Sequence, residues 1–167
     1  MTQTLANDLI QLLRDKIPNE LIVFIVSLLP VLELRGGLIA AKLLGVNLVP
    51  AFAICYLGNI LPIPFILIFI KNIFNFLRNK KGFSKLIKKL EERSLSKSEK
   101  VKRWRNFGLI MFVAIPLPGT GGWTGALIAA LLEMPVKKSF PLVALGVLIA
   151  GLIMSVVAYV IPGTFGL

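Results

Sequence analysis

The sequence predicts an all-α integral membrane protein built from two inverted repeats, and three observations lead to that prediction. Hydrophobic residues make up 56% of the chain, and its mean hydropathy is +0.84. Apolar runs near 21–45, 48–77, 107–132 and 140–162 each reach or approach the roughly 20 residues that span hydrocarbon. Breaks rich in proline and glycine interrupt the first and third runs. Each repeat is expected to be a re-entrant, broken helical hairpin followed by a transmembrane helix, and residues 1–167 leave room for a single membrane domain.

The start of the chain predicts an amphipathic helix over residues 4–17. Leu5, Leu9 and Leu12 recur at helical spacing on one face, and Asp8 and Asp15 belong to the polar residues set against them. The first residues carry no positive charge, so a cleaved signal peptide is not expected. We expect this helix to lie on the membrane surface.

The first repeat comprises a predicted hairpin at 20–45 and a transmembrane helix at 47–77. Glu33 and Arg35 lie in the middle of the otherwise apolar hairpin segment. A charge in the centre of a membrane segment costs roughly 2.5–3.5 kcal/mol, so charged residues there usually face a protein interior or a wet cavity and serve transport. This pair is therefore the first candidate for a functional site. The alternative is a buried ion pair that only fixes the helix register.

A basic loop is predicted at 78–105. It holds twelve of the 19 lysine and arginine residues. The positive-inside rule explains this concentration and places the loop in the cytoplasm, with contact to anionic lipids as a secondary role. The net charge of +11 therefore gives no reason to expect a nucleic-acid partner.

The second repeat comprises a predicted re-entrant hairpin at 106–133 and a transmembrane helix at 138–162. Residues 37–44 align with 126–133, and each block follows a proline- and glycine-rich break. If all four apolar segments crossed the membrane, Lys137 and Lys138 would lie outside, against the charge bias. Two re-entrant hairpins keep both basic stretches in the cytoplasm and give the halves inverted topology. Four full crossings remain the alternative.

Two motifs carry a family resemblance. They are Leu29-Pro30-Val31-Leu32-Glu33-Leu34-Arg35-Gly36-Gly37 and Ala114-Ile115-Pro116-Leu117-Pro118-Gly119-Thr120-Gly121-Gly122-Trp123-Thr124-Gly125. With the basic loop between them, they resemble the small multidrug export protein family over nearly the whole chain. The resemblance implies membrane transport. It extends to the DedA and VTT superfamily, whose members carry two facing re-entrant hairpins and include lipid and polyprenyl-phosphate translocases. DedA proteins typically have arginines around the second-hairpin proline, and residues 111–125 contain none.

The charged pair suggests a mechanism. Arg35 keeps its proton and offers a planar fork to a phosphate or carboxylate. Glu33 is the natural proton carrier, because burial favours its neutral form and nearby Arg35 its ionised form. Glycines in both breaks allow close backbone approach, and free N–H groups at helix starts would add donors for the ligand. The predicted substrate-binding or proton-coupling residues are Glu33, Arg35, Gly36, Gly37, Pro116, Pro118, Gly119, Thr120, Gly121, Gly122, Trp123 and Thr124.

The favoured function is transport of an amphipathic anion such as an anionic lipid or polyprenyl phosphate, coupled to protons. One alternative is export of lipophilic cations by Glu33, together with Glu133 and an aromatic face from Trp123. Another is a membrane scaffold that transports nothing. An enzyme is not expected, because the chain has no histidine, its one cysteine has no evident catalytic partner, and it shows no paired carboxylates or phosphate loop. We expect no cofactor or metal, a multi-pass location in the plasma (inner) membrane, membrane lipids as partners, and a homodimer because the chain is small.

Overall fold

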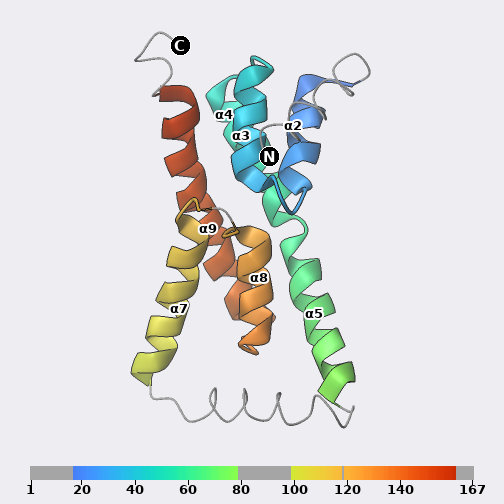
Figure 1. Ribbon diagram of the computed structural model, residues 1–167, viewed down its shortest axis with the longest axis vertical. Helices are drawn as coiled ribbons and strands as arrows, with labels where there is room; N and C mark the ends of the chain where they lie inside the picture. The colour runs from blue at the N-terminus through green and yellow to red at the C-terminus, as the bar shows by residue number, and fades with distance from the viewer. Residues whose placement is uncertain (1–16, 79–98, 118, 161–167) are drawn as a thin grey trace.

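The computed structural model describes residues 17–78, 99–117 and 119–160, and every regular element in these ranges is a helix (Figure 1). The first half contains α2 (Asn19–Leu28), α3 (Glu33–Leu43), α4 (Leu48–Ile60) and α5 (Ile63–Arg78). The second half contains α7 (Glu99–Ala114), α8 (Gly122–Leu131) and α9 (Val136–Ser155), which continues as the π-helical turn η1 (Val156–Val160). The predicted helix over 4–17 lies outside the described residues, apart from Ile17.

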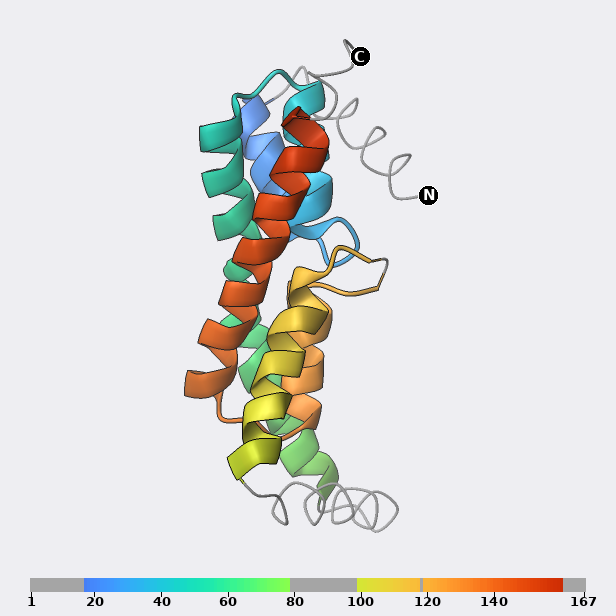
Figure 2. The same ribbon diagram turned by 90° about the vertical axis from the view of Figure 1, so that its left-hand side faces the viewer.

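Two helical hairpins occupy opposite ends of the molecule and meet at its middle. The α2–α3 hairpin fills one end and the α7–α8 hairpin the other, and their connecting turns face each other at mid-height (Figures 1 and 2). The α4–α5 segment and α9 run along the full length beside both hairpins. The buried core consequently continues from one hairpin to the other, from Val26 and Leu38 to Val113 and Val147.

Within the described ranges, two segments are long and apolar enough to cross a membrane. They are Leu48–Ile70, with 23 residues and a hydropathy of 2.2, and Val136–Val160, with 25 residues and a hydropathy of 2.6. Their outer faces expose large apolar side chains, and Val49, Phe65 and Phe69 are 80%, 69% and 65% exposed. An apolar outer surface of this kind suits contact with lipid rather than water.

The helix boundaries differ from the predicted ones at three places. The helix predicted over 47–77 is interrupted between Ile60 and Ile63, because the prolines at 62 and 64 lack the N–H groups that would continue the hydrogen bonding. Residues 99–105, predicted as part of the basic loop, already belong to α7, whose charged first turns contain good helix formers. Helix α9 starts at Val136, ahead of the predicted 138, because Pro135 sits at the N-cap and its carbonyl accepts from the N–H groups of Lys138 and Ser139.

Glycines bring three helices into close contact in each half, α2, α3 and α4 in the first and α7, α8 and α9 in the second. A methyl group on Gly37 of α3 would overlap Ser27 of α2 and lie 2.8 Å from Cys55 Sγ of α4. In the second half, a methyl group on Gly125 of α8 would overlap Val113 of α7 and lie 3.8 Å from Val143 of α9. Gly37 and Cys55 thus correspond to Gly125 and Val143 with a constant offset of 88 positions. The sequence alignment set residue 37 against residue 126, which is an offset of 89 positions.

The turns that follow α3 and α8 obey the same offset. Val46 N–H donates to Ala41 O at 2.9 Å, and Met134 N–H donates to Ala129 O at 3.0 Å. Gly45 has a φ of 73°, and its counterpart Glu133 has a φ of 52°. Both α3 and α8 therefore end in a turn with a left-handed residue, and the next helix, α4 or α9, begins a few residues later.

Candidate functional site

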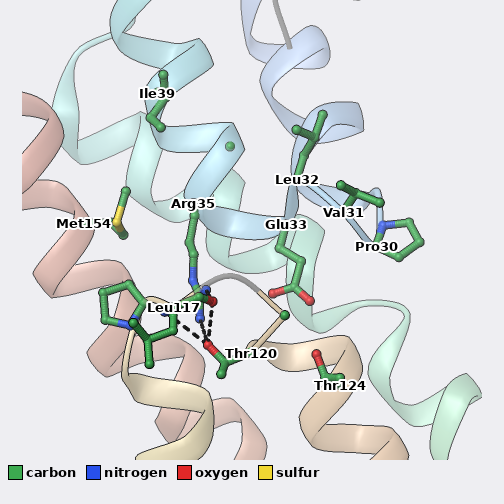
Figure 3. A pocket seen from close by; sticks show the side chains of 13 residues that line it. Pro30, Val31, Leu32, Glu33, Arg35, Ile39, Leu117, Thr120, Thr124 and Met154 are labelled. Atoms are coloured by element: carbon green, nitrogen blue, oxygen red, sulfur yellow. Dashed lines mark hydrogen bonds between the residues drawn. The ribbon is translucent and has the colours of Figure 1, made fainter. Parts of the chain in front are cut away.

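The candidate site lies where the two hairpin turns meet. After the break that contains Pro30, Glu33 begins α3 with a φ of 52°, a left-handed conformation that is uncommon for a residue with a side chain. Its counterpart at an offset of 88 is Gly121, the N-cap of α8, with a φ of 145°. Strained backbone often marks functional sites. Here it turns the first residues of α3 toward the second hairpin (Figure 3).

The Glu33 carboxylate caps the N-terminus of α8. Gly122 N–H donates to Oε2 and Trp123 N–H donates to Oε1, both at 3.1 Å. Glu33 is 5% exposed. The first amides of a helix have no partner within the helix and carry its positive dipole end, so a buried carboxylate is favourable there. A methyl group on Gly121 would overlap this carboxylate, so the contact requires glycine.

Arg35 binds the end of α7 and the turn that follows it. Its Nη1 donates to Leu117 O at 2.6 Å, and its Nη2 donates to Ile115 O at 3.2 Å and to Val113 O at 3.4 Å. Nη2 also donates to Thr120 Oγ1 at 3.0 Å. These contacts place a cation at the negative dipole end of α7. Within the described residues, no hydrogen bond joins Glu33 and Arg35. Their opposite charges nevertheless interact electrostatically.

Thr120 holds the second turn in shape. Its hydroxyl lies 2.8 Å from the carbonyl oxygens of Ile115 and Leu117, and it accepts from Leu117 N–H at 3.2 Å. The same hydroxyl accepts from Arg35, so the turn and the guanidinium position each other. Gly119, with a φ of 82°, supplies the left-handed residue that this turn needs.

A cavity of about 500 Å³ opens between the two turns (Figure 3). Its polar lining comes from Glu33, Arg35, Thr120 and Thr124. The rest of its lining consists of apolar residues and glycines, namely Pro30, Val31, Leu32, Gly36, Ile39, Pro116, Leu117, Gly119 and Met154. A cavity with a few polar groups in a mostly apolar wall suits an amphipathic ligand.

The structure brings most of the predicted site residues to this cavity. Glu33, Arg35, Gly36, Pro116, Gly119, Thr120 and Thr124 line it. Gly121 and Gly122 lie behind it against Glu33, Trp123 contributes its backbone N–H, and Gly37 packs against α2 and α4 instead. Pro118 lies outside the described residues.

One expectation about donors needs correction. The sequence suggested that the free N–H groups at the helix starts after the two breaks bind the ligand. At the start of α8, the N–H groups of Gly122 and Trp123 instead donate to the Glu33 carboxylate. Sequence reasoning also missed Ile39 and Met154 in the cavity wall. Nothing distinguishes these two from other apolar residues until the helices are packed.

The comparisons with known proteins identify the family. A family model described as "Putative small multi-drug export protein" matches residues 33–153. The chain belongs to the small multi-drug export protein family. The match begins at Glu33, directly after the first hairpin turn, and it covers the second turn and nine of the thirteen residues that line the cavity. No curated protein and no solved structure matches the chain.

Membership of this family fits the two apolar spans. A small multi-drug export protein with two helices of membrane-crossing length is a membrane protein of the transporter class. The wider relation to the DedA and VTT superfamily stays a prediction.

Proposed function

We propose that this small multi-drug export protein is a non-enzymatic transporter that binds the anionic headgroup of an amphipathic substrate in the cavity between its hairpin turns. The favoured substrates are anionic lipids and polyprenyl phosphates, and the favoured coupling ion is the proton. One observation carries the choice of an anion: Arg35 lines the cavity, and within the described residues its hydrogen bonds go to neutral oxygens. A phosphate would replace these neutral partners with an anion, whose oxygens pair with the charge of the guanidinium and accept two parallel N–H bonds from it.

Export of lipophilic cations is less well supported. Both oxygens of the Glu33 carboxylate already accept backbone N–H groups at the start of α8. The positive dipole end of that helix opposes a cation at the same place. Glu133 is exposed, and it does not line the cavity.

The membrane arrangement is part of the proposal. We place both hairpins as re-entrant segments, with α4–α5 and α9 crossing a plasma (inner) membrane in opposite directions. The basic stretch 78–105, which includes the first turns of α7, then lies in the cytoplasm. Inverted repeats are supported by the constant offset of 88 positions in the glycine contacts and turns and by the facing hairpin turns. In this arrangement the backbone of each break is covered by protein or cavity water, as hydrocarbon requires. Association of two chains into a homodimer would place more protein around the proposed transport path.

A competition experiment tests the choice of substrate. Purified protein in detergent is incubated with a fluorescent short-chain phosphatidic acid, and either an unlabelled lipid phosphate or a quaternary ammonium compound is added. We expect the lipid phosphate to displace the probe, the ammonium compound to leave it bound, and Arg35→Gln to abolish binding. Displacement by the ammonium compound alone would favour cation export. No binding of either ligand would favour the non-transporting scaffold.

A further inference from the structure

The cavity between the hairpin turns has a buried, charged end and an apolar rim. At the buried end, Glu33 is 5% exposed and Leu32 is 3% exposed. Val31 and Leu117 line the same cavity from the two turns, and they are 68% and 55% exposed (Figure 3). Exposed residues in the lining mark the place where a cavity opens. This cavity therefore opens between Val31 and Leu117, through an apolar rim.

The rim lies at mid-height of the molecule, where the two hairpin turns face each other. The α4–α5 segment and α9 extend past this level toward both ends (Figures 1 and 2). In the proposed membrane arrangement these helices span the hydrocarbon, which is roughly 30 Å thick. The rim then lies near the middle of the bilayer, and the cavity opens sideways toward the lipid chains.

The backbone of the second turn suits contact with hydrocarbon, where an unpaired polar group costs several kcal/mol. Pro116 has no N–H group. Leu117 N–H donates to Ile115 O at 2.9 Å and to Thr120 Oγ1 at 3.2 Å. The carbonyl oxygens of Ile115 and Leu117 both accept from Arg35, and the Thr120 hydroxyl lies 2.8 Å from each of them. The turn thus pairs its own polar groups at the rim.

An apolar stripe on α7 leads away from the rim. Trp104, Phe107, Met111 and Ile115 recur at helical spacing, and all four are exposed. Ile115 directly follows the helix, and its N–H still donates to Met111 O at 3.0 Å. From Trp104 to Ile115 the stripe measures about 16 Å, which is about half of the hydrocarbon thickness. A hydrocarbon chain that leaves the cavity can lie against this stripe.

We propose that the substrate is a lipid anion that enters the cavity sideways from the bilayer. Its headgroup reaches Arg35, and its hydrocarbon chain leaves between Val31 and Leu117 and lies against the α7 stripe. The cavity volume of about 500 Å³ supports this division. Sites of about 300–1,000 Å³ enclose a drug-sized ligand, and a lipid carries its chains in addition to a headgroup. The inference rests on the proposed function and excludes anions that reach the site from water.

Fluorescence quenching without substrate tests the sideways opening. A bimane dye is attached to Leu117→Cys in a Cys55→Ser background, and the protein is reconstituted into vesicles. We expect phosphatidylcholine brominated near its chain ends to quench the dye and aqueous iodide to leave it bright. Lys137→Cys is the control that iodide should quench, because Lys137 is exposed and lies outside the cavity. Quenching of the Leu117 dye mainly by iodide would overturn the proposal. A dye that neither agent quenches would also overturn it, because protein would then cover the rim.

Competition by phosphates with and without a chain tests the chain contact. Inorganic phosphate and a single-chain lipid phosphate are added to the protein with bound fluorescent phosphatidic acid. We expect the lipid to displace the probe at a concentration at least tenfold lower, because it alone has a chain to bind at the rim. Leu117→Asn should weaken binding of the lipid about tenfold, because its amide finds no hydrogen-bond partner beside a hydrocarbon chain. Leu152→Asn is the matched control, since Leu152 is 56% exposed on α9 and lies outside the cavity.

The outcomes separate this inference from the proposed function. Equal potency of the two phosphates, or equal losses in Leu117→Asn and Leu152→Asn, would overturn the chain contact and leave anion binding at Arg35 standing. Displacement by neither phosphate would overturn the proposed function, and this inference with it. If Leu117→Asn does not fold, Val31→Asn takes its place with the same expected loss.

Discussion

Replacement of Glu33 by glutamine should weaken the contact between the hairpins. The carboxylate accepts two N–H groups, those of Gly122 and Trp123, whereas the glutamine amide offers one oxygen and turns its NH₂ toward the other donor. One buried N–H without a partner costs about 1–3 kcal/mol. The lost interaction with the helix dipole adds up to about 2 kcal/mol in a buried setting. Relief from burying a charge offsets part of this sum, so we expect a net loss of about 1–3 kcal/mol.

Thermal unfolding in detergent micelles measures this loss. For a chain of this size, each kcal/mol corresponds to a shift in Tm of about 2–4 °C. The matched control is Glu133→Gln, because Glu133 is exposed, shares the φ of 52° and lies outside the cavity. A Tm for Glu33→Gln equal to that of Glu133→Gln would refute the role of the carboxylate as a cap for α8.

Three further predictions concern the headgroup contact, the helix packing and the topology. Arg35→Lys keeps the charge and loses the planar fork, so binding of a lipid phosphate in the fluorescence assay should weaken about 10- to 100-fold, and equal affinity would contradict bidentate binding. Gly125→Ala should lower stability by about 1–3 kcal/mol, because the new methyl group overlaps Val113. Adding Val113→Ala should restore part of the Tm, because the nearest remaining atoms lie 3.8 Å from that methyl group. A double variant with no higher Tm than Gly125→Ala would contradict this packing. A cysteine at Lys138 in a Cys55→Ser background should react with an impermeant thiol reagent only after cell lysis, whereas labelling in intact cells would indicate four full crossings.

The sequence was informative where a residue type is costly in a membrane. Glu33 and Arg35 stand out because charges in an apolar segment need a reason, and the proline and glycine breaks marked both hairpin turns. The all-helical class and the two long apolar spans follow from composition and are confirmed.

Other features depend on contacts between distant segments. Residues two apart on a helix point in different directions, so the sequence left the partners of Glu33 and Arg35 open, and these lie about 80–90 positions away in the second hairpin. Met154 could not be predicted as a cavity residue for the same reason. Only the packing of α9 against the hairpin turns distinguishes it from the other apolar residues of that helix.

Lipid translocation in proteoliposomes tests the central claim most directly. Vesicles carry a fluorescent anionic phospholipid, and an impermeant reductant reports how fast the dye reaches the outer leaflet. The account predicts translocation by the wild-type protein above that of empty vesicles, its loss in Arg35→Gln, and its retention in Lys137→Gln, which removes an exposed charge outside the cavity. Equal translocation by Arg35→Gln and the wild type would contradict an anion path through the cavity, and so would a wild-type rate no higher than that of empty vesicles.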